Sequence, residues 1–206
     1  MRPLPRVHAV TDGDVLALED LAVRAAAIAS GGASVALHVR DRKAGGARIA
    51  AMTRRFMTLA SPPQAAVVVN GHPDIAAALG AHGVQLKDSD LRPADARTFF
   101  HHGWIGCSVH TMEEAGTAVD QGADYLMVGT IFPTSSHPGG TVGGPELIAV
   151  CAGLGVPVIA IGGITPDRIA EVRRAGAYGV ASISALWSAR DPAAATAEFL
   201  RSWGTE

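Results

Sequence analysis

The stretch VPVIAIGGITPDRIAEVRRAGAYGVASIS, residues 156–184, predicts a strand, a helix and a second strand in succession. Its first part, residues 156–161, is an unbroken apolar run that ends at Gly162 and Gly163. Thr165-Pro166 then opens a segment with apolar residues at helical spacing, and a hydroxyl residue followed by proline is a helix start signal. Because a second apolar run, residues 179–184, follows this helix, the stretch is one β-α-β unit.

Both runs are apolar at every position, which is typical of parallel strands covered by helices on both faces. The strands also end in groups that suit an anion. Gly162 and Gly163 let backbone N–H groups approach a ligand, and Ser184 adds a hydroxyl before a helix start. Loops of this kind after the last two strands are typical of the phosphate site of a (β/α)₈ barrel. The alternative is that the glycines only make a tight turn and Ser184 only caps a helix.

Apolar runs and helical segments alternate along the rest of the chain with a period of about 25 residues, which fits a small (β/α)₈ TIM barrel. We expect an α/β protein with one such domain, residues 1–206. The expected strands are residues 7–12, 34–40, 65–70, 83–86, 104–110, 125–132, 156–161 and 179–184. The expected helices are residues 16–30, 47–59, 73–81, 93–100, a segment after Thr111, 145–154, a segment after Thr165 and 192–203. A doubly wound open sheet is the alternative, but residues 11–14 make a poor phosphate loop after the first strand.

Two local signals support these boundaries. Helices repeatedly end in Gly-Ala just before a strand, where a left-handed glycine lets the chain reverse. The four instances are at Gly32, Gly80, Gly122 and Gly176. Thr111 with Glu114 three residues later also predicts a capping box.

The composition excludes several classes of protein. With 206 residues, 48% hydrophobic and 17% charged, the chain is expected to be globular. A net charge of -2 gives no basic surface for a nucleic acid, and no apolar run approaches the ~20 residues that span a membrane. Two cysteines, Cys107 and Cys151, predict buried thiols in a reducing compartment, so we expect a cytoplasmic protein.

The residues at the predicted strand ends are cationic and hydroxylic, with several histidines, which suggests a small phosphorylated substrate and a proton transfer. They are Thr11, Asp12, His38, Arg40, Arg42, Asn70, Gln85, Lys87, Asp88, Asp90, Ser108, His110, Thr130, Thr134, Ser136 and His137.

Three of these positions allow alternative interpretations. His38, Arg40 and Arg42 alternate, so on a strand they would all point into the barrel mouth, where two guanidinium groups suit phosphate or carboxylate. Arg42 could instead lie beyond the strand in solvent. His110 could serve only in capping or packing, and His137 could be a lid residue, a general acid or base, or an exposed loop residue.

The stretches HAVTD, HVRDR, VVNGHPDIA, GAHGVQL, IGCSVHTMEEA, GADYLMVGTIFPTSSHPG, VPVIAIGGITPDRIAEV and GVASIS span nearly the whole chain. In this order they resemble the thiamine phosphate synthase/TenI family of small TIM barrels. The resemblance implies one of two activities in thiamine biosynthesis, and possession of the same fold does not decide between them.

The synthase of this family joins a pyrimidine diphosphate to thiazole phosphate. It uses a Gln-x-Arg-x-Lys strand end, a Mg²⁺ ion held partly by Asn-Asp, and a Pro-Thr-x-Thr-Lys loop. This chain has His38-x-Arg40-x-Arg42 in the first place, Asn70-Gly71 in the second and a loop from Pro133 to His137 in the third. One metal-binding carboxylate and the loop lysine are therefore missing, and Asp90 is left as the acidic ligand.

The His-x-Arg-x-Arg and Asn-Gly signatures look like the TenI branch, for which the implied reaction is a thiazole tautomerisation without metal. The resemblance places the phosphate anchor at Gly163 and Ser184, with Gly162 and Ile183 adjacent. The essential histidine of the known tautomerase falls at Thr130 here, so another histidine would have to move the proton.

From these observations we expect first a metal-independent tautomerase-like isomerase that acts on thiazole phosphate with no cofactor. The proton-transfer candidates are His137, His38 and His110, and the substrate-binding candidates are Arg40, Arg42, Asn70, Ser108, Thr130, Thr134, Ser136, Gly162, Gly163, Ile183 and Ser184. The alternatives are a synthase that uses Mg²⁺ through Asp90 and a non-catalytic binder of thiazole or thiamine phosphate. By resemblance a homodimer is possible.

Overall fold

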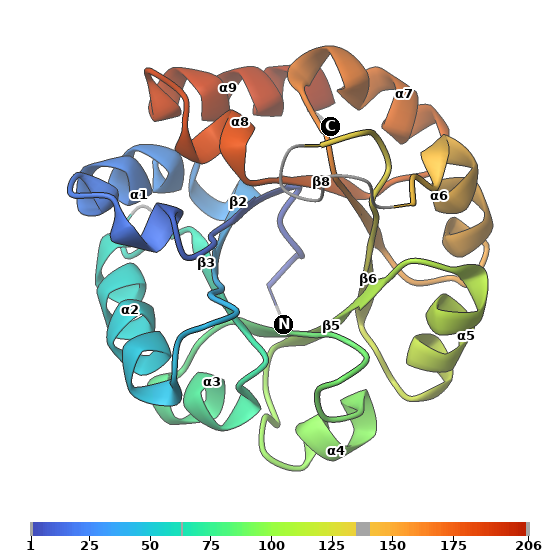
Figure 1. Ribbon diagram of the computed structural model, residues 1–206, viewed down its shortest axis with the longest axis horizontal. Coiled ribbons are helices and arrows are strands. Elements are labelled where there is room, and N and C mark those ends of the chain that lie inside the picture. Colours follow the sequence, from blue (N-terminus) through green and yellow to red (C-terminus); the bar gives the residue numbers. More distant parts are fainter. Residues whose placement is uncertain (1, 63, 135–140, 205–206) are drawn as a thin grey trace.

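The computed structural model describes residues 2–62, 64–134 and 141–204, and it is a closed barrel of eight parallel strands in sequential order. The ring closes because β1 pairs with both β2 and β8 (Figure 1). The strands are β1 (Val7–Val10), β2 (Val35–Val39), β3 (Ala66–Asn70), β4 (Gly83–Leu86), β5 (Trp104–Val109), β6 (Tyr125–Val128), β7 (Val158–Ile161) and β8 (Gly179–Ser182). The expected (β/α)₈ barrel is therefore confirmed.

Helices surround the ring of strands on its outer side (Figure 1). They are α1 (Leu21–Ala29), α2 (Gly46–Leu59), α3 (Pro73–Leu79), α4 (Pro93–Arg97), α5 (Met112–Asp120), α6 (Gly144–Ala152), α7 (Ile169–Arg174), α8 (Ser184–Trp187) and α9 (Pro192–Trp203). Short 3₁₀ turns form at η1 (Val15–Ala17), η2 (Gly32–Ser34) and η3 (Pro166–Arg168). The helix expected after Ser184 is the single turn α8, which packs beside α9.

Most expected boundaries agree with the structure to within three residues, but two are wrong by four or more. The helix expected over residues 16–30 begins only at Leu21, because Leu18 has an extended backbone and separates η1 from α1. The strand expected over residues 125–132 ends at Val128. Ile131 is fully buried although it lies beyond the strand, so its apolar character reflects packing of the following loop.

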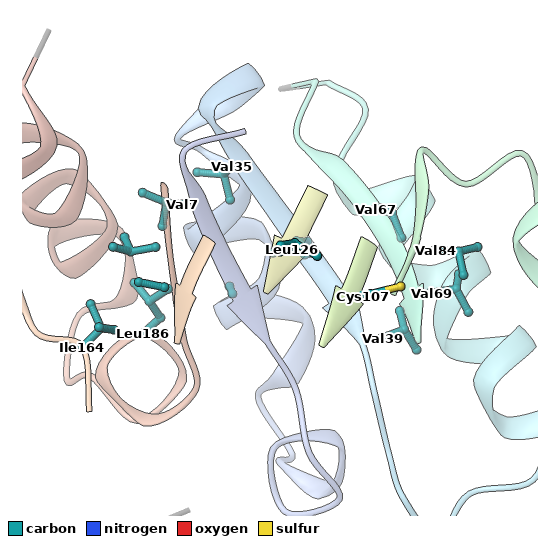
Figure 2. Close-up of a cluster of buried hydrophobic side chains, with 14 of the residues drawn as sticks. Val7, Val35, Val39, Val67, Val69, Val84, Cys107, Leu126, Ile164 and Leu186 are labelled. Carbon is teal, nitrogen blue, oxygen red and sulfur yellow. The ribbon is translucent and has the colours of Figure 1, made fainter. Parts of the chain in front are cut away.

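The apolar strands are buried on both faces, as their composition predicts. Val67 and Val69 on β3 belong to the cluster between strands and helices, which Figure 2 shows together with Val7, Val35 and Leu126. The alternate residues of the strands fill the barrel interior instead. That interior cluster contains Leu4, Val10, Ala36, Ala66, Val68, Trp104, Tyr125, Met127, Ile159 and Ala181.

Several smaller expectations are confirmed as well. The glycines of the four Gly-Ala pairs have positive φ, from 65° at Gly32 and Gly80 to 101° at Gly176, so they reverse the chain as predicted. Cys107 and Cys151 are buried free thiols. Among the helices of the described residues, none is long and apolar enough to cross a membrane.

Candidate active site at the barrel mouth

The carboxyl ends of the eight strands meet at one end of the barrel, here called the mouth, and most of the candidate residues lie there. Those at or just after a strand end are His38, Arg40, Asn70, Ser108, His110, Thr130, Gly162, Gly163, Ile183 and Ser184. Parallel strands in sequential order bring together residues that are far apart in the chain.

Arg40 is half-buried directly after β2, and Thr11 fixes its backbone. The Thr11 hydroxyl donates to the carbonyl groups of His38 and Arg40 at 2.9 and 3.0 Å, and it accepts from the Arg40 N–H at 2.8 Å. Burial lowers the pKa of the Arg40 guanidinium, and the neighbouring Arg42 lowers this pKa further. Asp12 and Asp41 act on this pKa in the opposite direction, but burial and Arg42 outweigh them. A partly buried guanidinium of this kind would gain from a bound anion.

Arg42 lies three residues past the end of β2 at Val39, and its side chain is exposed. Arg42 therefore lies beyond the strand, as in the alternative interpretation, and does not point inward from β2. It remains close enough to Arg40 to act on the pKa of that guanidinium, so both arginines contribute positive charge to this side of the mouth.

His38 does not face solvent at the mouth, since the structure buries it completely inside the barrel. His38 Nε2 lies 2.8 Å from Nδ1 of His8, a buried residue of β1 that sequence analysis did not single out. His8 Nε2 lies 3.0 Å from the Pro5 carbonyl oxygen, and His38 Nδ1 lies 3.3 Å from the Asn70 amide. These contacts form a chain from the floor of the barrel to its mouth.

Burial holds both of these histidines in the neutral form. It lowers the pKa of His8 to about 4, although the hydrogen bond to Pro5 acts in the opposite direction. It also lowers the pKa of His38 well below its ordinary value, and the neighbouring His8 adds to the effect. Each ring therefore has one N–H donor and one bare nitrogen acceptor.

Two further polar side chains continue the interior layer next to Asn70. Gln85 is on β4 in register with Asn70, and its Nε2 donates to the Ser108 hydroxyl at 3.1 Å. Gln85 Oε1 is buried and has no hydrogen-bond partner in the described part of the chain. Buried polar atoms are usually paired, so this oxygen is a candidate ligand contact.

His110 bridges the ends of β5 and β6. Its Nδ1 contacts the Gly129 carbonyl oxygen, and its backbone N–H donates to Glu114 Oε2 at 2.6 Å. Glu114 N in turn donates to the Thr111 hydroxyl at 3.2 Å, which confirms Thr111 as the helix cap. The return bond of a capping box is replaced, because the Glu114 carboxylate accepts from the His110 N–H and not from that of Thr111. His110 is exposed and its ring lies against the Gly129 carbonyl after β6, so a role in proton transfer and a role in packing both stay predictions for this residue.

The loop between β6 and α6 begins against the end of β7. The Ile131 and Phe132 N–H groups donate to the carbonyl groups of Ile161 and Gly162, each at 3.0 Å. A Cβ atom at Gly163 would lie 2.6 Å from the Pro133 carbonyl oxygen, so only glycine permits this approach. The glycine pair therefore does more than make a tight turn, because the absence of side chains lets the loop after β6 pack directly on it.

A hydrogen bond joins the first and last described parts of this loop. The Gly143 N–H donates to the Thr130 carbonyl at 2.8 Å, and Thr130 itself is half-buried beside Gly162. Thr134 is also half-buried. Two further candidates of this loop, Ser136 and His137, lie outside the described residues.

Ser184 is exposed at the first position of α8, and Ile183 precedes it. The loops after β7 and β8 lie next to each other because these strands pair. The arrangement brings Gly163 and Ser184 to one side of the mouth, opposite the strands that carry Asn70 and Gln85.

Asp90 is the carboxylate at the mouth that could bind a magnesium ion. One of its carboxylate oxygens accepts from the Lys87 N–H at 3.0 Å, and a Cβ atom at Gly71 would lie 3.5 Å from the same oxygen. In the described residues, no three His, Cys, Asp or Glu side chains group to hold a metal. Mg²⁺ commonly uses one or two carboxylates together with water and substrate phosphates. The residues therefore fit an ion that arrives with a diphosphate, and they do not form a complete protein site.

Two cavities in the described part of the chain lie at opposite ends of the barrel wall, and the smaller one adjoins strand ends. The larger, about 780 Å³, lies at the opposite end of the barrel between Arg2, Tyr178 and Trp203. The smaller, about 400 Å³, is lined by Lys87, Asp90, Ser108 and neighbouring residues after β4 and β5. We place the candidate site by its polar side chains, because the larger cavity lies away from them.

Comparison with known proteins decides the family. The family described as thiamine monophosphate synthase, TMP-TENI, matches residues 7–186. The chain belongs to this family. A thiamine-phosphate synthase of Salinispora arenicola is 38% identical over 97% of this chain and 98% of that relative. One of Salinibacter ruber is 35% identical over 96% and 88%.

A solved structure agrees with this membership. Thiamine phosphate pyrophosphorylase from Pyrococcus furiosus superposes with a TM-score of 0.82 at 30% identity, covering 96% of this chain and 95% of that one. The expectation of a thiamine phosphate synthase/TenI family member is thus confirmed, whereas the preference for the tautomerase branch is wrong. These full-length relatives are named as synthases, so the His-x-Arg-x-Arg and Asn-Gly signatures did not identify the branch.

Proposed function

We propose that this chain is a thiamine-phosphate synthase, which joins a pyrimidine diphosphate to thiazole phosphate and releases pyrophosphate. The observation that carries the proposal is 38% identity to a relative of that name across almost the full length of both chains. The threonine at position 130 agrees with this reaction. A coupling that expels pyrophosphate needs stabilisation of negative charge more than a proton shuttle at that place.

Arg40 and Arg42 are the proposed diphosphate ligands. Arg40 is held by Thr11 at the end of β2, and both the partial burial and the second arginine favour neutralisation by an anion. The charge that develops on the leaving pyrophosphate would fall in this field. These two residues would therefore contribute to catalysis as well as to binding.

Gly163 and Ser184 are the proposed anchor for the phosphate of the thiazole substrate. Ser184 presents an exposed hydroxyl at the start of α8, and the positive φ of 63° at Gly163 directs the chain sharply at the end of β7. Binding each substrate to a different set of strand ends would hold the reacting atoms together between them.

Asp90 would hold the Mg²⁺ ion, which when bound supplies charge neutralisation for the diphosphate. Gly71 occupies the position of a second carboxylate in the family pattern, so the ion would take its remaining ligands from the diphosphate and from water. In the loop, His137 replaces the lysine of that pattern. Together with Thr134 and Ser136 it would donate hydrogen bonds to the same anion.

Calorimetric titration with the pyrimidine diphosphate, with and without Mg²⁺, tests this assignment of the site. We expect binding that requires the ion and that weakens at least tenfold in Asp90→Asn. Asp88→Asn is the matched control, since Asp88 is an exposed carboxylate in the same loop. Equal binding with and without Mg²⁺ would contradict the proposed role of Asp90, and no binding under either condition would contradict the synthase.

A further inference from the structure

The chain of contacts through His8, His38 and Asn70 has only two neutral arrangements of hydrogen atoms, and they differ at the mouth. In the first, His8 donates from Nε2 to the Pro5 carbonyl and accepts at Nδ1 from His38 Nε2. His38 Nδ1 is then bare and needs a donor from Asn70. In the second, each donor and acceptor exchange roles: His38 donates from Nδ1 to Asn70, His8 donates from Nδ1 to His38 Nε2, and His8 Nε2 is bare.

The second arrangement places two acceptors against each other at the floor of the barrel. A bare His8 Nε2 would face the Pro5 carbonyl oxygen at 3.0 Å, and a backbone carbonyl cannot become a donor. In the first arrangement the two facing acceptors are at the mouth, where the bare His38 Nδ1 faces Asn70 Oδ1, and this conflict can be removed. The two ends of an asparagine amide exchange places by rotation, so its NH₂ group can take the place of Oδ1 beside His38.

We therefore infer that His8 is a positioning residue, which acts through His38 to hold the Asn70 amide with its NH₂ toward His38 and its carbonyl oxygen toward the substrate. The 3.3 Å contact recorded between His38 Nδ1 and Asn70 Oδ1 is accordingly assigned to the amide nitrogen. Asn70 then presents an acceptor to the mouth. Its register partner on β4, Gln85, carries a buried oxygen, Oε1, that has no hydrogen-bond partner in the described residues.

The acceptor at Asn70 limits the chemistry of the group that it can bind. It suits a hydrogen-bond donor, such as an amino group of the proposed pyrimidine substrate, and it would repel a phosphate oxygen. Asn70, which sequence analysis placed among the phosphate-binding candidates, is thereby assigned to the donor side of the substrate. Arg40 and Arg42 remain on the anion side.

The orientation can be measured in the wild-type protein without any assay of activity. In long-range ¹H–¹⁵N spectra of histidine-labelled protein at pH 7, the nitrogen shifts distinguish the Nε2–H and Nδ1–H tautomers. We expect His8 and His38 both to be neutral Nε2–H tautomers. An Nδ1–H or a doubly protonated His38 would overturn the inference. His102→Phe, which removes an exposed histidine, serves as the control variant for assignment.

A variant tests whether His8 controls Asn70. In His8→Phe, the His38 Nε2–H loses its acceptor, so His38 should change to the Nδ1–H tautomer and turn the NH₂ of Asn70 toward the mouth. This kinetic part rests on the proposed synthase function. We expect KM for the pyrimidine diphosphate to rise about tenfold, as for one reversed hydrogen bond, with kcat changed less than threefold.

The outcomes separate the two proposals. An unchanged His38 tautomer or an unchanged KM in His8→Phe would overturn the positioning role, whereas absence of turnover in the wild type would count only against the synthase. In that case the tautomers still decide the inference. The wild-type spectra also decide it if His8→Phe does not fold.

Discussion

Arg40 is the residue on which the proposed diphosphate site depends most. Replacing it by glutamine removes a charge-assisted contact, which contributes roughly 1.5–3 kcal/mol, so we expect affinity for the pyrimidine diphosphate to fall about ten- to hundredfold. Calorimetry measures this change. Arg55→Gln, on the exposed side of α2, is the matched control, and equal affinities in the two variants would remove Arg40 from the site.

Ser184 is expected to donate one charge-assisted hydrogen bond to the phosphate of the thiazole substrate. In Ser184→Ala, binding of thiazole phosphate should weaken by roughly 1.5–3 kcal/mol, or about ten- to hundredfold. Ser188→Ala, at the other end of α8, should leave this affinity unchanged. If the two variants bind equally well in a calorimetric titration, the phosphate anchor lies elsewhere in the mouth.

His8 makes the folding stability depend on pH. Its pKa is about 4 in the folded protein and close to 6.5 when unfolded, so the unfolded chain binds a proton first as the pH falls. The contribution is complete above about pH 6.5 and is lost progressively down to about pH 4, by an amount of the order of 3 kcal/mol. Urea unfolding across this pH range should show that the free energy of unfolding decreases less in His8→Phe than in the wild type. An identical pH dependence in the two proteins would mean that other groups cause the loss of stability.

At the scale of elements, the loop after β6 depends on the glycines after β7. Gly163 has a φ of 63°, and an added Cβ would also meet Phe132 and Pro133 within 2.9 Å. Gly163→Ala should therefore destabilise the protein by at least ~1 kcal/mol and raise KM for both substrates. The measurement is the free energy of unfolding in urea, together with steady-state kinetics.

Gly116 provides the comparison, because it lies inside α5 and a Cβ there would meet nothing within 4 Å. Gly116→Ala should stabilise the protein by about 0.5–1 kcal/mol. If Gly163→Ala behaves like Gly116→Ala, the loop does not depend on the glycine at position 163.

Most strands and helices could be predicted from sequence, because apolar runs, Gly-Ala endings and the Thr111 cap are local signals. The errors occurred where tertiary packing takes over. Ile131 is apolar because the loop is buried, and Leu18 interrupts a run that has helical composition throughout. Neither fact is contained in a window of neighbouring residues.

At the scale of the whole molecule, the predicted strand ends identified the mouth as the region of the candidate site, but they did not predict how deeply each side chain is buried. His38 and Arg40 alternate as predicted, yet His38 points to a buried partner on β1 while Arg40 reaches the mouth. The pairing of His38 with His8 depends on the register between two strands, which a single sequence does not specify. The strand-end signature likewise did not distinguish the two activities of the family, whose relatives are named as synthases.

The expected homodimer and the cytoplasmic location stay predictions. The family membership, in contrast, is established over residues 7–186, and the synthase proposal follows from the names of the full-length relatives and the cationic mouth. The central claim is therefore that this barrel forms a bond between two phosphorylated substrates.

Release of pyrophosphate in the presence of both substrates tests this claim most directly. The account predicts release that requires the pyrimidine diphosphate, thiazole phosphate and Mg²⁺ together, with thiamine phosphate formed in equal amount. It also predicts a strong decrease in Arg40→Gln and none in Arg55→Gln. Absence of pyrophosphate release by the folded protein, or release that does not depend on thiazole phosphate, would contradict the account.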